Sequence, residues 1–175
     1  LREGGCDPRD KKVLIVGTGG AARSIAFALV SKARELLIMG RSRAGALGLT
    51  RDLREESEVE IRNRALSSRS LRRAVRNTDI LINATSVGMW PDTQHSIIYS
   101  KDIPSHIAVF EVVYNPARTK LLEQAEEAGA RTISGIGMLV HQGAEAFRIW
   151  TGRAAPIEVM RKAILSELSR RDSRS

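Results

Sequence analysis

The residues best suited to bind a ligand lie in the segment VLIVGTGGAARS, where an aliphatic run leads directly into glycines. The spacing Gly17-x-Gly19-x-x-Ala22, between a strand and a helix, is typical of a turn that binds a diphosphate. Gly17 permits the tight turn, and the small Ala22 lets the helix pack close to the strand. Backbone N–H groups and the positive end of the helix dipole would then face the phosphates. The residues that leave room for them are Gly17, Gly19, Gly20 and Ala21.

A pair of arginines follows the next apolar run, in MGRSR, about 20 residues after the glycines. NAD-binding domains usually have Asp or Glu at this point, where the carboxylate accepts hydrogen bonds from the ribose 2′-hydroxyl. Arg41 and Arg43, with Ser42 between them, favour a 2′-phosphate instead, since each charge-assisted hydrogen bond from a guanidinium is worth about 1.5 to 3 kcal/mol. The segment therefore predicts NADP, and the alternative is that both arginines are ordinary solvent-facing loop residues.

Short aliphatic strands alternate with helices along the chain, which predicts parallel pairing. The expected fold is a doubly wound parallel α/β sheet of the Rossmann type. We expect helices at 19–32, 44–56, 70–77, 119–130, 137–152 and 156–170, and strands at 12–16, 35–40, 58–63, 79–85, 107–116 and 131–135. Ligands of such sheets lie beyond the carboxyl ends of the strands. The segments to consider are therefore 17–22, 40–43, 84–89, 113–116 and 135–142.

The composition is that of one soluble globular domain, with 175 residues, 42% hydrophobic and 27% charged. No apolar run approaches the ~18 residues that a membrane span needs. The single Cys6 forms no internal disulfide, and no signal segment opens the chain, so a cytoplasmic location is expected.

The net charge of +8 implies an anionic partner, either a phosphorylated small molecule or nucleic acid. Ten arginines between residues 41 and 76 favour a nucleic-acid-binding module. Interspersed acidic residues, an aromatic content of only 4% and the lack of a recognition motif argue against it.

Several later segments follow GTGGAAR in a fixed order: NATSVGM (83–89), VYNP (113–116), TKLL (119–122), GIGMLVHQGAEAF (135–147) and WTG (150–152). This series resembles the C-terminal, cofactor-binding domain of shikimate dehydrogenase over about residues 12–160. The resemblance implies NADP-linked reduction of 3-dehydroshikimate to shikimate, in aromatic amino-acid biosynthesis. A quinate-using relative or another NADP-dependent dehydrogenase of similar fold is the alternative, and a cofactor-binding sensor without chemistry is a third.

The resemblance also assigns roles to single residues. It implies cofactor contacts for Gly17, Gly19, Gly20, Ala21, Arg41, Ser42, Arg43, Thr85, Ser86, Met89, Val113, Gly135 and Met138, and substrate contacts for Tyr114 and Gln142. Asn83 is expected to hydrogen-bond the turn after its strand. The sequence departs from the family at Gly40, where Asn is usual, and at Glu111, where Asp is common.

Reduction of a ketone needs a proton donor within hydrogen-bond reach of the developing alkoxide. In shikimate dehydrogenases a Lys and Asp pair in an N-terminal substrate domain does this, and this chain shows neither in matching context. We therefore expect no catalytic residue and no metal ligand in the chain, and we expect it to bind NADP(H) without appreciable turnover.

The expected organisation has three parts: an interdomain remnant at 1–12, the NADP-binding domain at 13–155, and a C-terminal helix and tail at 156–175. Residues Ile157, Met160, Ile164 and Leu168 are at helical spacing, and as an exposed face they offer a surface for self-association.

Overall fold

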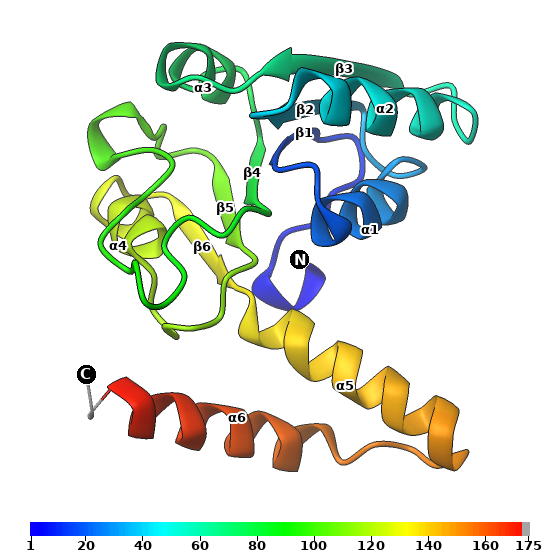
Figure 1. The fold of residues 1–175 in the computed structure, drawn as a ribbon, viewed down its shortest axis with the longest axis vertical. Helices are drawn as coiled ribbons and strands as arrows, with labels where there is room; N and C mark the ends of the chain where they lie inside the picture. The colour runs from blue at the N-terminus through cyan, green and yellow to red at the C-terminus, as the bar shows by residue number, and fades with distance from the viewer. Residues whose placement is uncertain (173–175) are drawn as a thin grey trace.

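The computed structural model describes residues 1–172 and shows one parallel sheet with helices on both faces (Figure 1). Its strands are β1 (Lys12–Val16), β2 (Glu35–Gly40), β3 (Glu60–Ala65), β4 (Ile80–Asn83), β5 (Ala108–Glu111) and β6 (Arg131–Ser134). Their order in the sheet is β3-β2-β1-β4-β5-β6, and every neighbouring pair is parallel. The predicted doubly wound Rossmann-type sheet is confirmed.

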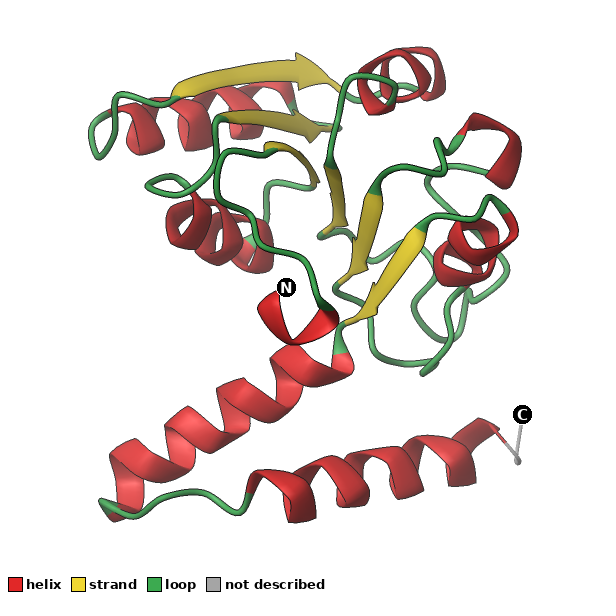
Figure 2. Ribbon diagram, turned by 180° about the vertical axis from the view of Figure 1, so that it is seen from behind, coloured by secondary structure: helices red, strands yellow, loops and turns green. Residues whose placement is uncertain are grey.

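The main helices are α1 (Gly20–Leu29), α2 (Arg43–Arg54), α3 (Ser68–Val75), α4 (Lys120–Glu127), α5 (Ile136–Thr151) and α6 (Ile157–Asp172). Two short 3-10 helices, Arg2–Gly4 and Ser100–Asp102, complete the described elements. Figures 1 and 2 show α1 and α2 together on one side of the sheet, and α3 and α4 together on the other. Because all the strands are parallel, every strand-to-helix connection lies at the carboxyl edge of the sheet.

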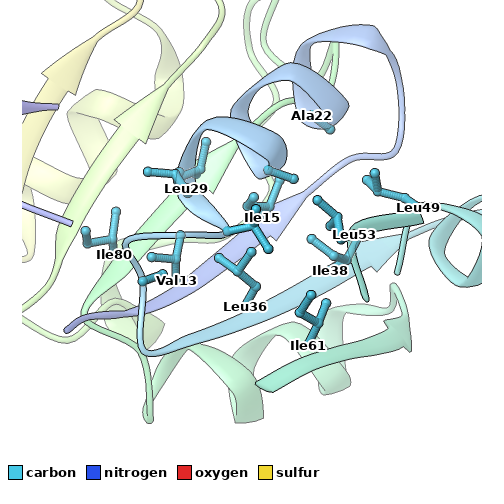
Figure 3. Packing of buried hydrophobic residues seen from close by; sticks show 14 of the residues in the cluster. Val13, Ile15, Ala22, Leu29, Leu36, Ile38, Leu49, Leu53, Ile61 and Ile80 are labelled. Carbon is cyan, nitrogen blue, oxygen red and sulfur yellow. The ribbon is translucent and has the colours of Figure 1, made fainter. Parts of the chain in front are cut away.

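The core follows from the alternation of side chains along the strands. In β1, Val13 and Ile15 pack against the α1 and α2 side, and Leu14 and Val16 pack on the opposite face. Figure 3 shows the first of these two layers, where Leu29 of α1 and side chains of α2 meet the strands. Because both faces of β1 are buried, its sequence is a continuous apolar run.

The chain reverses its direction of winding between β1 and β4. It proceeds outward from β1 through β2 to β3, and then returns to the other side of β1 to form β4. In open α/β sheets this switch point leaves a crevice outside the carboxyl ends of the two strands, where ligands bind. The loops that begin at Gly17 and at Ala84 flank this crevice.

Three strands differ from the sequence prediction by two residues or more at one end, and β6 ends one residue earlier than predicted. Residues 60–65 form β3, rather than 58–63, because the edge strand is aligned by its pairing with β2, from Glu35 opposite Glu60 to Gly40 opposite Ala65. The strands expected at 79–85 and 107–116 end at Asn83 and Glu111. Both strands are followed by backbone that hydrogen-bonds to these two polar side chains, so the ladder does not continue.

The last two helices leave the sheet and run back beside each other (Figure 1). Leu168 of α6 is 6% exposed and packs with Ile136 and Val140 of α5, and Ile157, Met160 and Ile164 are partly buried against the same cluster. The apolar face that was expected to be exposed is therefore largely covered within the chain, because α6 folds back along α5. Of the expected C-terminal helix and tail, residues 173–175 lie outside the described residues. None of the helices in residues 1–172 has the length and apolar character of a membrane span.

Candidate active site at the carboxyl edge of the sheet

Gly17, at the start of the glycine loop, lies where the three central strands meet. Its φ of +127° is disfavoured for residues with a side chain, and a Cβ here would lie 2.4 Å from the carbonyl oxygen of Ala84. Its backbone N–H donates to the carbonyl oxygen of Met39, at 2.8 Å. Only glycine fits this position, because β1, β2 and β4 all converge on it.

Gly19 and Gly20 face open space, unlike Gly17, since a Cβ at either position would have no other atom within 4 Å. Gly19 is the N-cap residue of α1 and provides no side-chain hydrogen bond, and the first turn carries no acidic residue. The first N–H groups of α1 therefore face open space with the helix dipole behind them. Ala22, by contrast, is fully buried against the sheet, as its position in the pattern predicted.

The arginine turn lies beside the glycine loop, between β2 and α2. Ser42 caps α2, and its Oγ accepts a hydrogen bond from the N–H of Gly45 at 3.1 Å. Arg41 and Arg43 are exposed, and neither forms an ion pair with another described residue. Arg23, one turn into α1, is by contrast paired with Asp52 at 2.9 Å. Two unneutralised guanidinium groups thus lie at the end of β2.

Thr18 packs the glycine loop against this turn. A Cβ on Gly40 would lie 2.5 Å from Thr18 Cγ2, and a Cβ on Gly45 would lie 3.0 Å from Thr18 Oγ1. Thr18 thus occupies the space that a side chain at residue 40 needs. This contact gives a steric reason for glycine at position 40, where the sequence departs from the pattern of the similar family.

A groove of about 340 Å³ lies across the switch point, beyond β4 and β5. Its lining residues are Ala21, Ala84, Thr85, Ser86, Met89, Trp90, Val112, Val113, Tyr114 and Asn115. The first turn of α1 and the two loops after β4 and β5, which are far apart in the sequence, therefore meet here, and they contain six of the residues assigned by resemblance. Met89, Trp90 and Tyr114 are exposed large side chains at its mouth. Sequence reasoning did not select Trp90, whose only distinguishing feature is an indole in an irregular segment, directly before Pro91.

A buried polar network lies under this groove and joins its walls. Glu111, at the end of β5, is fully buried and accepts hydrogen bonds from Asn83 Nδ2, the N–H of Val113 and Thr119 Oγ1. Burial raises the pKa of the Glu111 carboxyl to about 7, and these hydrogen bonds oppose that rise. Asn83 also accepts from the N–H and hydroxyl of Thr85, at 3.1 and 2.7 Å, which confirms its predicted role in the turn.

Three predicted site residues lie outside the glycine loop, the arginine turn and the groove. Gly135 is the N-cap residue of α5 and contacts the loop after β5, since a Cβ there would lie 2.4 Å from the carbonyl oxygen of Val112. Met138 lines a larger cavity of about 830 Å³ between α1, β6 and the last two helices. Gln142 is exposed on α5. In the described part of the chain, His, Cys, Asp and Glu side chains form no group of three or more that can hold a metal ion.

Comparisons with known proteins agree with this architecture. The family model described as Shikimate / quinate 5-dehydrogenase matches residues 3–113, and the model of the Shikimate 5'-dehydrogenase C-terminal domain matches residues 135–165. A shikimate dehydrogenase (NADP(+)) of Methanosarcina mazei is 41% identical over 169 residues, which are 96% of this chain and 60% of that protein. The chain thus spans well under two thirds of the length of this relative.

Solved structures of longer proteins superpose on most of the chain. A crystal structure of shikimate dehydrogenase in complex with NADP+ is 36% identical, with a TM-score of 0.81, over 91% of this chain and 55% of that one. Quinate dehydrogenase from Corynebacterium glutamicum, in complex with NAD, is 28% identical, with a TM-score of 0.83, over 94% of this chain and 58% of that one. The glycine loop, the sheet order and the sequence matches thus lead to one conclusion: this chain belongs to the shikimate / quinate 5-dehydrogenase family.

Proposed function

We propose that this chain is the cofactor-binding part of an NADP-dependent shikimate dehydrogenase, an oxidoreductase that interconverts 3-dehydroshikimate and shikimate. The observation that carries the proposal is the juxtaposition, at one switch point, of an open helix N-terminus behind glycines and a groove lined by the loops after β4 and β5. The relative from Methanosarcina mazei is a shikimate dehydrogenase named for NADP(+), which supports both the reaction and the cofactor.

The glycine loop fits the diphosphate of a dinucleotide. At Gly19 and Gly20 the space that a side chain would fill is open, and the N–H groups of the first turn of α1 have no competing side-chain cap. Such a turn binds phosphate oxygens through backbone N–H groups and the helix dipole. Gly17 keeps the loop close to β4, so that one ligand can reach from this loop into the groove.

Arg41 and Arg43 are the proposed ligands of the 2′-phosphate, with Ser42 between them. Both guanidinium groups are exposed and lack an acidic partner in the described chain, so a bound phosphate would not have to displace an ion pair. A carboxylate at this position would repel the phosphate. The charge pattern therefore favours NADP over NAD.

The groove is the proposed site of the nicotinamide half. When bound, NADPH supplies the hydride for the reaction. Thr85 and Ser86 on one wall and Val113 on the other bind and orient this half, with Met89 packed beside it. Tyr114, at the mouth, is placed to contact the substrate. For Gly135, Met138 and Gln142, assigned only by resemblance, contacts with the carboxamide, the ring and a substrate hydroxyl remain part of the proposal.

A quinate dehydrogenase is the second candidate. The family model covers both substrates, and the similar Corynebacterium glutamicum enzyme is a quinate dehydrogenase that was solved with NAD. The arginine turn bears on the cofactor and not on the choice between the two substrates, because an NAD-linked enzyme gains nothing from two unpaired cations at the ribose.

Calorimetric titration with NADP+ and NAD+ tests the proposal. We expect tighter binding of NADP+, and Arg41→Ala should weaken its binding about tenfold or more while leaving NAD+ unchanged, since one charge-assisted hydrogen bond is lost. Arg153→Ala is the matched control, because Arg153 is an exposed arginine in the loop after α5, in a different part of the chain. Equal affinity for both cofactors would refute the assignment of NADP, and no binding of either would refute the proposal as a whole.

An activity assay tests the assignment of the chemistry. The 175-residue chain should bind NADP+ but show negligible shikimate-dependent NADP+ reduction, because the residues lining the groove include neither Lys nor Asp, the pair that the resemblance implies as proton donor. Robust turnover by this chain would show that the donor lies within residues 1–175.

A further inference from the structure

Glu111 is an unusual residue to lie buried beneath a binding groove. Its carboxylate is fully buried at the end of β5, and all of the groups that donate to it are neutral: an amide, a backbone N–H and a hydroxyl. A buried carboxylate without a cationic partner is costly, and hydrogen bonds compensate that cost only in part. An apolar side chain would fill this space more favourably, unless the acceptor oxygens serve a purpose.

The donors to Glu111 come from both walls of the groove. Asn83 Nδ2 lies 3.0 Å from each carboxylate oxygen, and the same side chain uses its own oxygen to hold Thr85, in the wall after β4. The N–H of Val113 donates to Oε1 at 2.9 Å and belongs to the wall after β5, directly before Tyr114. One carboxylate therefore fixes both walls relative to each other.

A second link closes the walls at the surface. The backbone N–H of Trp90 donates to the carbonyl oxygen of Asn115 at 2.9 Å, so the loops after β4 and β5 are joined above and below the groove. The upper link is exposed to solvent at the Trp90 side chain, whereas the lower link through Glu111 is buried. The buried link is the stronger constraint, because water does not compete for its hydrogen bonds.

We propose that Glu111 is a positioning residue that sets the separation and orientation of the two walls holding the nicotinamide half of the cofactor. It does so through Asn83 on one side and the N–H of Val113 on the other, without contact with the ligand. This inference rests on the proposed function of the groove. It distinguishes the two halves of the cofactor site, since no hydrogen bond of Glu111 reaches the glycine loop or the arginine turn.

Glu111→Gln is the informative substitution, because it keeps the size of the side chain and replaces one acceptor oxygen with an N–H₂ donor. At either oxygen position that donor faces Asn83 Nδ2, which lies 3.0 Å from both oxygens, and in addition Val113 or Thr119; the Thr119 hydroxyl can rotate to accept from it, whereas Asn83 Nδ2 and the Val113 N–H can only donate. Rotation of the Asn83 amide does not resolve the conflict, since its N–H₂ would then face the N–H of Thr85. In every arrangement that leaves Thr119 bonded, a wall of the groove loses a hydrogen bond.

Binding of two probes measures the effect. NADPH occupies both halves of the proposed site, and 2′,5′-ADP occupies only the adenosine half. At pH 8, where the wild-type Glu111 carboxyl is mostly ionised because its pKa is about 7, we expect the Kd of NADPH to rise about tenfold in Glu111→Gln, with the Kd of 2′,5′-ADP unchanged, since one hydrogen bond to a charged group is lost at the nicotinamide half alone. Glu111→Asp keeps the charge but draws the carboxylate back, and should give an intermediate ratio of the two Kd values.

Thr119→Val is the matched control. It removes the hydroxyl that donates to Glu111 Oε2 and caps α4, but Thr119 lies in neither wall. The free energy of unfolding of Thr119→Val should fall, whereas the ratio of the Kd values of NADPH and 2′,5′-ADP should stay at the wild-type value. This control therefore separates an effect on positioning from an effect on folding. If Glu111→Gln does not fold, the intermediate ratio in Glu111→Asp decides the question.

Three results would overturn the inference. Equal weakening of both probes would show that Glu111 supports the fold as a whole. Unchanged binding of both probes by folded Glu111→Gln would show that the walls do not depend on it. Failure of the wild-type chain to bind 2′,5′-ADP would refute the proposed function itself, and this inference with it.

Discussion

Replacing Glu111 with glutamine should change the way in which the stability of the fold depends on pH. In the unfolded chain this carboxyl ionises near its ordinary pKa of 4.5, whereas in the folded chain burial raises its pKa to about 7. Between pH 4.5 and about pH 7, the folded state holds a proton that the unfolded state has released. The free energy of unfolding therefore decreases as pH rises through this interval, because stability falls wherever the native state binds more protons.

The size of the effect follows from the two pKa values. At 1.36 kcal/mol for each pKa unit, the difference between 4.5 and about 7 corresponds to about 3 kcal/mol. The stabilising contribution is complete below pH 4.5 and is lost once the pH has passed 7. Carboxylates with lowered pKa, such as Asp52 beside Arg23, act in the opposite direction but are present in both proteins. The comparison between wild type and Glu111→Gln therefore isolates Glu111.

Urea unfolding of both proteins at pH 5 and pH 8 provides the measurement. Wild type should lose about 2.5 kcal/mol more than Glu111→Gln between these two values of pH, because a small part of the total is already lost at pH 5. Any constant cost of introducing the amide cancels, because it is the same at both. An identical pH dependence of the two proteins, or a larger loss in the glutamine variant, would show that Glu111 is not a buried acid with a raised pKa.

Other predictions concern the packing around the site. Gly17→Ala should lower the free energy of unfolding by about 2 kcal/mol or more, because of the positive φ and the contact with the Ala84 carbonyl. Gly19→Ala should change the free energy of unfolding little, because a Cβ there meets no other atom. Similar losses for the two variants in urea unfolding would contradict this prediction. Gly40→Asn should destabilise the fold by about 1 to 3 kcal/mol, because the new side chain collides with Thr18. Adding Thr18→Ala to the same chain should recover part of that loss. If the losses of unfolding free energy of the two single variants simply add in the double variant, the contact is excluded. Leu168→Ala should speed amide hydrogen exchange in α6, because it removes about 2 kcal/mol of packing energy, and should leave exchange in the strands unchanged. Unchanged exchange in α6 would mean that the helix does not depend on this contact.

The sequence predicted the elements whose structure is decided locally. The apolar run before Gly17 and the glycine spacing predicted β1, its turn and α1, because both faces of the strand are buried and the turn needs residues without a large side chain. The N-cap role of Thr119 follows from its own hydroxyl, which accepts from the N–H of Leu122. Such features depend on neighbours within a few residues.

The ends of the strands depended on distant partners. The register of β3 is aligned by β2, and the polar side chains of Asn83 and Glu111 end β4 and β5 through hydrogen bonds to loops and to each other. Resemblance to a family supplied most of the groove residues. It gave no reason to select Trp90, whose place at the mouth depends on how two loops meet.

The sequence by itself determined the parallel Rossmann-type sheet, the open turn before α1 and the two arginines after β2, because periodicity, glycine and charge act over short distances along the chain. Only the tertiary structure decided that segments about 30 residues apart form one groove, and that Glu111 lies beneath it with hydrogen bonds to both walls. The physical reason is the parallel sheet, which brings the carboxyl ends of successive strands to one edge and buries a carboxylate that sequence alone shows only as a charged residue after a strand.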